Sequence, residues 1–338
     1  MRVLLTGGTG YIGSHTAVAL LGAGYEVVLF DSLRNSKPVV VKRIQEITGK
    51  AVTFVCGDVR NKGDIQRALQ QSKSDVVIHF AGLKSVGESV TNPLEYYDTN
   101  VGGTLNLIGA MQEAGLRKLV FSSSATVYGA PAYLPIDENH AVSAFQPYGR
   151  SKLIVEEVLS DLSRSDPTWR IGVLRYFNPI GAHESGLIGE DPMGVPNNLM
   201  PFVAQVAVGA RPFLNVWGGD YPTKDGTGIR DYIHVMDLAE GHMSAIARID
   251  QFPGRFTVNL GTGNGYSVLE MVSAFERASL RPVPYRISER RSGDVAEVYA
   301  DVRMSEQLLG WRAVRSLEDM CNDQWRWQSS NPLGYPDL

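Results

Sequence analysis

Short apolar runs and amphipathic stretches alternate along the first half of the chain. The runs have the length of strands, and the stretches between them repeat apolar positions at helical spacing. Strands are expected at 3–5, 26–30, 52–55, 75–80, 118–122 and 171–177. Helices are expected at 14–21, 39–47, 64–70, 94–114 and 148–162. Because strands and helices alternate, the order predicts a mostly parallel, doubly wound α/β sheet.

The alternation ends near Asn178, where proline and glycine become frequent over 179–196. Helices and short strands then follow in no regular order. We expect residues 1–177 to form the sheet domain, and residues 178–338 to form mainly a smaller α/β domain over its carboxyl edge. A helix near 235–248 is expected to return to the first domain.

A glycine-rich turn follows the first strand, with Gly7, Gly10 and Gly13 at three-residue spacing before the first helix. Strand, glycine turn and helix together are the context in which this spacing indicates dinucleotide binding. The glycines permit a tight turn, close approach of the backbone to a pyrophosphate and close helix–strand packing. The pyrophosphate then lies at the positive end of the helix. We therefore expect a Rossmann-type fold.

The end of the second strand favours NAD over NADP. Asp31 lies 18 residues beyond Gly13, near the offset of about 20 residues at which an acid binds the adenosine ribose. A carboxylate there repels a 2′-phosphate. Arg34 and Lys37 follow and could serve NADP instead, so the preference rests on Asp31. Asp58, just past the third strand, is expected near the adenine, with a solvated loop aspartate as the alternative.

Composition narrows the class of protein. Of 338 residues, 43% are hydrophobic and 20% are charged, as in ordinary globular proteins. The net charge of −4 argues against a nucleic-acid or membrane partner, because no basic excess is present to bind phosphates. Two cysteines fit a reducing compartment. No signal peptide or membrane helix is expected, and we expect a cytoplasmic protein.

Tyr148 and Lys152 stand about one helical turn apart, so their side chains leave the same face of the predicted helix. With Ser124, after the fifth strand, they resemble the catalytic set of the short-chain dehydrogenase/reductase family. Removing a hydride from a carbinol carbon requires a base for the hydroxyl proton. A tyrosine, with a pKa of about 10, needs nearby cations to act as that base. We expect Tyr148 to be the base, Lys152 to lower its pKa and hold the nicotinamide ribose, and Ser124 to bind the reacting oxygen.

The two positions after Ser124 separate branches of this family. Nucleotide-sugar dehydratases and decarboxylases carry an acid there, whereas this chain has Ala125 and Thr126. The pattern favours oxidation followed by return of the hydride. Nearly the whole chain resembles the UDP-glucose (UDP-galactose) 4-epimerase family, within the extended short-chain dehydrogenase/reductases. The segments that carry this resemblance are 6–15, 79–97, 121–129, 175–182, 196–201, 225–237 and 290–294.

The resemblance implies a tightly held NAD⁺ and the interconversion of UDP-galactose and UDP-glucose. Tyr148 would take the 4-hydroxyl proton as carbon 4 gives up its hydride. The 4-keto sugar would then rotate and receive the hydride on its other face. The cofactor residues that the resemblance and the glycine turn imply are Gly7, Gly10, Tyr11, Ile12, Gly13, Asp31, Asn35, Ser36, Asp58, Val59, Phe80, Ala81, Gly82, Lys84, Thr99, Ser122, Tyr148, Lys152 and Phe177.

The substrate residues are likewise implied by the resemblance. They are Lys84, Ser124, Tyr148, Asn178, Asn198, Leu199, Asn215, Val216, Trp217, Arg230, Tyr232, Arg291, Asp294 and Val298. Arg230 and Arg291 would bind the diphosphate, for which a guanidinium fork is well shaped. The alternative for each is a surface salt bridge. Asp294 would bind the uridine ribose.

Two positions leave questions open. Thr99 stands where the family usually has asparagine, although a threonine hydroxyl can still hydrogen-bond the cofactor. A large aromatic residue at position 298 restricts family members to glucose and galactose, and a small one admits N-acetylated sugars. Val298 is intermediate in size, and Tyr299 beside it could fill the same space.

Three alternatives follow for function. The substrate could be UDP-N-acetylglucosamine or a UDP-uronic acid, although no clamp for a sugar carboxylate is evident. A non-enzymatic NAD-sensing protein is more remote, because such proteins lack the tyrosine–lysine pair. The six histidines lack metal-ligand spacing, so no metal is expected. By resemblance, helices 94–114 and 148–162 would pair with their copies in a homodimer through a four-helix bundle.

Overall fold

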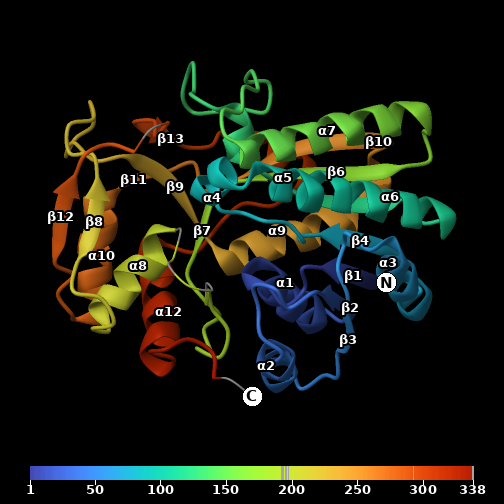
Figure 1. The fold of residues 1–338 in the computed structure, drawn as a ribbon, viewed down its shortest axis with the longest axis horizontal. Helices are drawn as coiled ribbons and strands as arrows, with labels where there is room; N and C mark the ends of the chain where they lie inside the picture. The colour runs from blue at the N-terminus through green and yellow to red at the C-terminus, as the bar shows by residue number, and fades with distance from the viewer. Residues whose placement is uncertain (192–193, 195, 197, 292, 337–338) are drawn as a thin grey trace.

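The computed structural model describes residues 1–191, 194, 196, 198–291 and 293–336, so Asn197 and Ser292 of the segments above lie outside it. Its centre is a parallel sheet of seven strands in the order β10-β6-β5-β4-β1-β2-β3 (Figure 1). The strands are β1 (Arg2–Thr6), β2 (Glu26–Asp31), β3 (Thr53–Cys56), β4 (Val76–His79), β5 (Lys118–Ser124), β6 (Arg170–Tyr176) and β10 (Gly254–Leu260). The predicted doubly wound α/β fold is confirmed.

Side chains alternate between the two faces of this sheet, and each face is covered by its own helices. Val3 and Leu5 belong to one apolar core, and Leu4 between them belongs to the other. Burial on both faces explains why the strands have continuous apolar sequences. The first core includes α1 (Tyr11–Gly22), α2 (Val39–Thr48) and α9 (Val235–Arg248). The second includes α3 (Lys62–Ser72), α6 (Gly103–Glu113) and α7 (Pro147–Ser165).

The order of strands reverses beside β1. The chain builds β1, β2 and β3 outward in one direction, then crosses to β4 on the other side of β1. Ligands of open α/β sheets bind at such a switch point, outside the carboxyl ends of the strands. The loops after β1 and β4 approach closely here, since a Cβ on Gly7 would lie 2.7 Å from the amide nitrogen of Ala81.

The sheet has one strand more than the sequence analysis predicted. β10 comes from the second half of the chain and pairs in parallel with β6 along its whole length. The helix expected near 235–248 is present as α9, which packs against α1 and leads the chain back to this edge. Residues 235–260 therefore complete the central sheet, although they follow elements of the smaller unit in sequence.

The single helix expected at 94–114 is interrupted. It consists of α5 (Pro93–Tyr96), a π-helical segment (Tyr97–Gly102) and α6. Such segments occur frequently at functional sites, and this one contains the buried residues Thr99 and Asn100. The sequence analysis also missed a short helix before it, α4 (Val86–Thr91). Two 3₁₀ turns, at Ala125–Tyr128 and Ile249–Gln251, follow β5 and α9 respectively.

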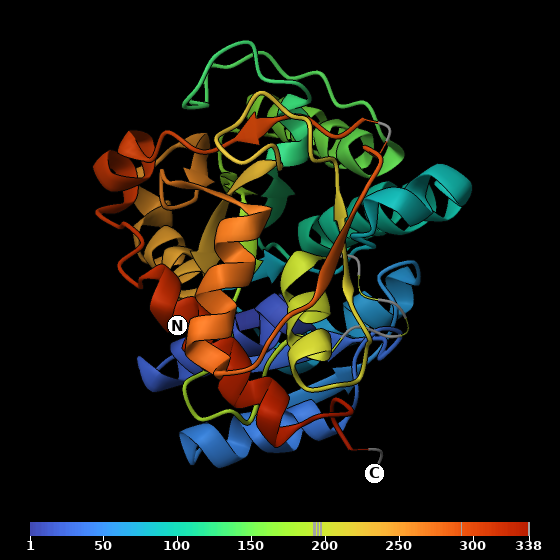
Figure 2. The ribbon, with the colours of Figure 1, turned by 90° about the vertical axis from the view of Figure 1, so that its left-hand side faces the viewer.

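The remaining elements form a smaller unit beside the sheet (Figures 1 and 2). Strand β9 (Ile229–His234) is the centre of a four-stranded sheet with β7 (Asn178–Ile180), β11 (Gly265–Ser267) and β13 (Glu297–Val298). A parallel pair joins β8 (Leu214–Trp217) to β12 (Tyr285–Ser288). The helices are α8 (Leu199–Ala207), α10 (Val268–Ser279), α11 (Arg303–Leu309) and α12 (Leu317–Ser330), of which α8, α10 and α12 share an apolar core with β8.

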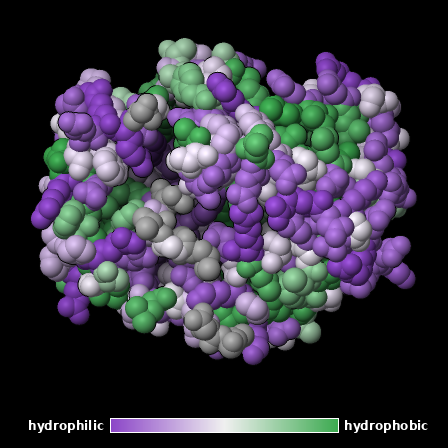
Figure 3. All heavy atoms as spheres, viewed as in Figure 1, coloured by the Kyte–Doolittle hydropathy of each residue, from purple (hydrophilic) through white to green (hydrophobic). Residues whose placement is uncertain are grey.

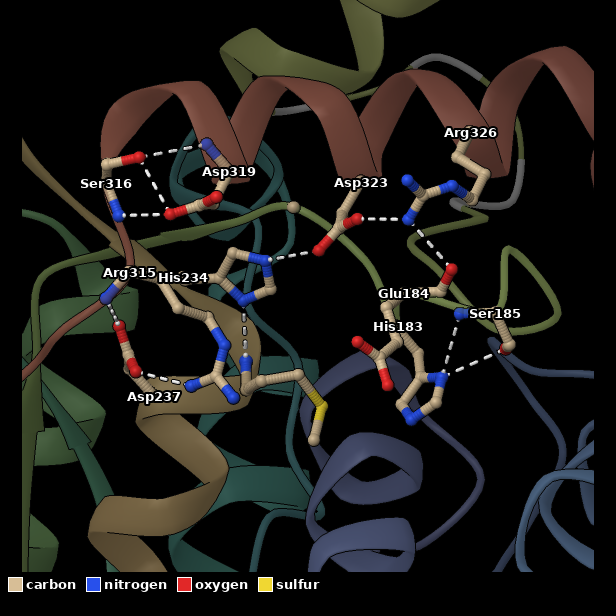
Figure 4. Close-up of polar contacts among 12 residues, drawn as sticks. His183, Glu184, Ser185, His234, Asp237, Arg315, Ser316, Asp319, Asp323 and Arg326 are labelled. Carbon is tan, nitrogen blue, oxygen red and sulfur yellow. Dashed lines mark hydrogen bonds and ion pairs between the residues drawn. The ribbon is translucent and has the colours of Figure 1, made fainter.

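Buried polar contacts fasten α12 to the start of α9 (Figure 4). His234 accepts the Met236 amide at 3.0 Å through Nδ1, which caps α9, and its Nε2 faces Asp323 of α12 at 3.3 Å. Asp237, in the first turn of α9, is fully buried and pairs with Arg315. Because α9 also packs on the central sheet, these contacts join the smaller unit to the sheet.

Within the described residues, no helix combines the length and apolar character needed to cross a bilayer.

Candidate active site

A cavity of about 350 Å³ opens at the carboxyl ends of the central strands, beside the switch point. Every residue that the sequence analysis assigned to the cofactor lines it. So do three further residues, Ser124, Asn178 and Asn198, which were assigned to catalysis or substrate but not to the cofactor. The sheet topology therefore gathers residues that are spread over nearly 200 positions of sequence into one space.

The glycine turn provides a cradle for a phosphate at the start of α1. Gly7 has a φ of +69°, which favours glycine. The first helical hydrogen bond is donated by the Ser14 amide to the Gly10 carbonyl at 2.9 Å. The amides of Tyr11, Ile12 and Gly13 therefore precede the helical ladder, and their N–H groups are available to an anion.

The clearest steric test of this cradle is Gly13→Ala. A Cβ at Gly13 would lie 2.2 Å from the carbonyl oxygen of Gly7, and backbone cannot yield as a flexible side chain can. We expect the variant to lose retained nicotinamide cofactor, measured as NAD released on denaturing the purified protein. Gly22→Ala is the matched control, because a Cβ there meets nothing within 4 Å. Equal cofactor content in both variants would contradict this role of Gly13.

Asp31 lies at the end of β2, on the wall of the cavity. Its carboxylate accepts the amides of Thr9 at 3.1 Å and Leu33 at 2.9 Å, which fixes its orientation. The two basic residues that could have favoured a 2′-phosphate both have protein partners. Arg34 forms an ion pair with Glu95, and Lys37 donates to the Tyr335 carbonyl at 2.8 Å. These contacts favour the ribose hydroxyls of NAD as the partner of Asp31.

Two further features of the lining fit a nicotinamide dinucleotide. Thr99 lines the cavity, and its Oγ1 is buried and has no hydrogen-bond partner among the described residues. Gly82 faces Asn100 and Lys152, and a Cβ there would lie 3.0 Å from Asn100 Oδ1. Asp58, which we expected near the adenine, lines the cavity and is paired with Arg60, which lowers the pKa of its carboxyl.

Ser124, Tyr148 and Lys152 meet in this cavity. Ser124 ends β5, and its Oγ accepts the amide of Thr126 at 3.2 Å and the Thr126 hydroxyl at 3.0 Å. Because both contacts use Ser124 Oγ as the acceptor, its own proton is free to be directed at the phenol of Tyr148, whose pKa Ser124 lowers. Lys152 donates from Nζ to the Ser122 carbonyl at 2.8 Å.

Burial shifts the pKa values of both ionisable residues of this set, Tyr148 and Lys152. Burial raises the pKa of Tyr148, and the hydrogen bond from Ser124 lowers it in part. Burial lowers the pKa of Lys152 to about 8, opposed by the charge of Glu156. Among the protein's own groups, Ser124 and not Lys152 lowers the pKa of Tyr148. The expected effect of Lys152 acting together with the positive nicotinamide of NAD⁺ stays a prediction. Ionisation of the phenol requires an additional positive charge in the cavity.

The other residues assigned to the substrate stand outside the lining of this cavity, as far as the described residues define it. Asn215, Val216 and Trp217 lie in β8, and Leu199 begins α8. The glycines that precede Arg230 in the sequence indicate a loop before a strand, but Arg230 lies within β9, paired in register with Val298 of β13. The loop that contains Gly226-Thr227-Gly228 ends at Gly228, and the strand begins at Ile229, one residue before Arg230.

Four of these substrate residues are electrostatic neighbours. Burial raises the pKa of Tyr232 to about 12, and the charges of Arg230 and Arg291 lower it in part. Burial also raises the pKa of Tyr221, which the charge of Asp294 raises further and the same two arginines lower. Arg291 and Asp294 form an ion pair at 2.9 Å. The second half thus presents a cluster of cations suited to a diphosphate, beside a carboxylate suited to a sugar hydroxyl.

Sequence reasoning missed two residues of the site. Asn100 accepts the Leu83 amide at 2.7 Å and donates to Ser151 at 2.9 Å, so it holds the loop after β4 against α7. Glu190 lines the cavity as a buried acid. It lies in a proline- and glycine-rich stretch without a spacing pattern that would have marked it. No group of three or more metal-ligating side chains occurs among the described residues.

The fold and this site define a Rossmann-type enzyme of the extended short-chain dehydrogenase/reductase class. A family model described as GDP-mannose 4,6 dehydratase matches residues 4–324. The chain is 56% identical over 335 residues to the UDP-glucose 4-epimerase of Bacillus subtilis (strain 168), with 99% of each covered. It therefore belongs to the family of that model and, within it, to the UDP-glucose 4-epimerases.

Similar sequence identity and coverage are found with a human protein and with a solved bacterial structure. The UDP-glucose 4-epimerase of Homo sapiens is 53% identical over 341 residues, covering 99% of this chain and 98% of the human one. The crystal structure of UDP-glucose 4-epimerase from Bifidobacterium longum in complex with NAD⁺ and UDP matches with a TM-score of 0.96. That structure is 51% identical and covers 99% of this chain and 100% of its own.

Proposed function

We propose that this protein interconverts UDP-galactose and UDP-glucose by NAD-dependent epimerisation at sugar carbon 4. The observation that carries the proposal is the meeting of Ser124, Tyr148 and Lys152 in the cavity of the glycine turn. The two residues after Ser124 supply no acid for elimination, and the Thr126 hydroxyl is bonded to Ser124 itself. Oxidation followed by return of the hydride is the chemistry that remains.

Each residue of the set has a part in moving one proton. When bound, NAD⁺ supplies a hydride acceptor and a positive charge. That charge offsets the burial that raises the pKa of Tyr148, so the phenol can take the proton of the sugar 4-hydroxyl. Ser124 donates a hydrogen bond to the phenol or to the sugar oxygen. Lys152 holds the ribose hydroxyls of the cofactor with the ammonium protons that the Ser122 carbonyl does not use.

The 4-keto sugar must turn over between the two hydride transfers while the nucleotide stays bound. We infer that residues 178–338 provide this anchor and that residues 1–177 bind mainly the cofactor. The diphosphate is assigned to Asn178, Asn198, Arg230 and Arg291. The assignment is supported by the cationic neighbourhood of the two arginines and by the place of the two asparagines in the cavity lining. Uracil is assigned to the edge of β8, and its ribose to Asp294.

The experiment that tests the function uses purified protein, UDP-galactose and no added NAD, with proton NMR of the anomeric signals. We expect UDP-glucose to accumulate to a fixed ratio, because the cofactor is retained and regenerated in each turnover. If nothing forms, NAD⁺ is added to replace cofactor lost in purification. An unchanged sample even then would refute the proposal for this sugar.

UDP-N-acetylgalactosamine and a UDP-uronic acid are the second and third substrates of the same assay. Val298 pairs with Arg230 across β13 and β9, so the side chain that sets the size limit lies beside a proposed diphosphate ligand. Turnover of the N-acetylated sugar would show that Val298 leaves enough room for it. A non-enzymatic NAD-sensing role is disfavoured, because the chain keeps all three catalytic residues.

We also propose a homodimer through α5–α6 and α7. Figure 3 shows an apolar patch at the upper right, where Figure 1 draws α7 and α6. On these helices Leu105 is 49% exposed, and Ile154, Val158 and Leu162 remain partly exposed. A two-fold axis would cover these side chains with their copies as a four-helix bundle. Sedimentation equilibrium that gave only the 37.0 kDa mass of one chain would exclude the dimer.

Two free cysteines, Cys56 and Cys321, support the cytoplasm as the compartment of this protein.

A further inference from the structure

A buried carboxylate lies in the cavity where the proposed reaction needs to hold two anionic diphosphates. The side chain of Glu190 is 4% exposed and contributes to the cavity lining. Its negative charge also raises the pKa of Tyr11, behind the larger effect of burial, which places it near the glycine turn. A carboxylate in this position repels phosphate groups, so its unfavourable effect on binding must be offset by another contribution of Glu190.

Glu190 joins the two halves of the site. Its Oε1 accepts a hydrogen bond from Lys84 Nζ at 2.5 Å and another from Asn198 Nδ2 at 2.9 Å. Lys84 follows β4 in the central sheet, whereas Asn198 precedes α8 in the smaller unit. One oxygen atom therefore connects a residue assigned to both cofactor and substrate with a residue assigned to the diphosphate.

The behaviour of Asn198 shows that this contact directs a side chain. Asparagine at the N-cap of a helix ordinarily bonds to a backbone amide in the first turn. Asn198 occupies the N-cap of α8, yet its side chain makes no capping hydrogen bond. It is turned to Glu190 instead. The contact leaves the second amide proton and the carbonyl oxygen of Asn198 for a ligand, and two of the three protons of Lys84.

The position of Glu190 is itself fixed from both sides by Tyr335. The Gly189 amide donates to the Tyr335 hydroxyl at 3.1 Å, and the Tyr335 amide donates to Asp191 at 2.9 Å. Gly189 has no room for a side chain, because a Cβ would lie 2.3 Å from the Trp327 ring. A residue held so firmly can orient its partners, and prior ordering of a long side chain such as Lys84 removes an entropy cost from binding.

We propose that Glu190 is a positioning residue that holds Lys84 and Asn198 across the cavity, and that it thereby sets the affinity for the diphosphate of the UDP-sugar. The inference rests on the proposed function. It assigns Glu190 no contact with the reacting carbon, so substrate affinity depends on it and the rate of hydride transfer does not.

The test compares Glu190→Ala and Glu190→Gln with the unaltered holoenzyme, using calorimetry with UDP and the epimerisation assay. We expect Glu190→Ala to raise the Kd for UDP and the KM for UDP-galactose about tenfold, with kcat within about twofold. Glu190→Gln keeps an oxygen acceptor, so we expect an increase of about threefold. Removal of a negative charge alone would strengthen the binding of an anion, so the sign of the change separates positioning from simple charge.

Glu184→Gln is the matched control, since it removes the same charge six residues earlier on the same segment. Its side chain is exposed and does not line the cavity, and its backbone oxygen accepts a hydrogen bond from Arg326 (Figure 4). We expect no change in Kd or KM. In an Asn198→Ala background, Glu190→Ala should add less than about twofold, because residues that act through one another are not additive.

Three results would overturn the proposal: tighter binding of UDP by Glu190→Ala, a fall in kcat at constant KM, or full additivity with Asn198→Ala. An unaltered enzyme that binds UDP without epimerising it would refute the proposed function. The comparison of Kd values would still decide the role of Glu190 in that case. An enzyme that does not bind UDP would overturn both.

Discussion

Replacement of Tyr148 by phenylalanine is expected to lower kcat for UDP-galactose by about 10³-fold, within the range that a positioned acid–base group contributes. The variant keeps the ring that packs in the cavity and loses only the phenol oxygen, whose pKa Ser124 lowers. Retained NAD and the melting temperature should change little, because the neighbouring contacts of Lys152 do not involve that oxygen. The measurement is single-turnover epimerisation with the cofactor content of each sample determined.

Tyr133→Phe provides the control for this result. Tyr133 is 48% exposed and its hydroxyl donates to Asp137 at 2.9 Å, on a loop that does not line the cavity. The same atom is thus removed from a site without chemistry, and kcat should be unchanged. Full turnover by Tyr148→Phe would remove this residue from the role of base and require another group to take the proton.

Arg175→Met is expected to lower the free energy of unfolding by about 3–5 kcal/mol, the usual cost of leaving one partner of a buried ion pair alone. Arg175 of β6 contacts both carboxylate oxygens of Glu156, at 3.0 and 2.6 Å, and the two side chains are 8% and 3% exposed. Arg175 also donates to the Tyr128 hydroxyl at 3.0 Å, which in turn donates to Asn259 of β10 at 2.7 Å. The network therefore links β6, α7, the 3₁₀ turn Ala125–Tyr128 and β10 at this edge of the sheet.

Urea unfolding measures this effect, and a double variant explains it. Glu156→Leu in the Arg175→Met background removes the stranded carboxylate, so most of the lost stability should return. Glu156 lies one turn after Lys152 on α7, and we expect the single variant also to lose activity as that face of the helix shifts. A loss below about 1 kcal/mol from Arg175→Met alone would mean that water or a neighbouring group compensates Glu156.

The parts of the fold that could be predicted from sequence are those with local signals. Spacing or apolar patterns within a few residues predict the glycine turn, the first six strands and α9. β10 has the same apolar character, but its place beside β6 depends on the packing of α9 on α1. The π-helical segment Tyr97–Gly102 could not be predicted, because its low helix propensity indicates a weak helix without specifying a π-helical turn, and tertiary contacts decide.

The candidate site divides in the same way. Residues that follow strand ends were predictable, because parallel strands deliver their carboxyl ends to one edge, and these residues line the cavity. The contact of Glu190 with Lys84 joins positions 106 apart, and nothing in either local sequence marks the other. The lowered pKa of Lys152 was missed for a related reason, since burial is a property of the packed molecule and not of the Tyr-x-x-x-Lys pattern.

The return of the chain through α9 and β10 bears on how this protein can be divided or can move. The polypeptide leaves the central sheet after β6, comes back at α9 and leaves again after β10. It returns once more at α11, which contacts α9 and β10, so several connections join the smaller unit to the central sheet. A fragment that ended at residue 177 would expose the hydrogen-bonding edge of β6 and the apolar face of α1 that α9 covers, which favours aggregation over independent folding. The same interlacing opposes a wide hinge opening, so entry of the nucleotide sugar must rely on local movement of loops around the cavity and not on separation of the halves.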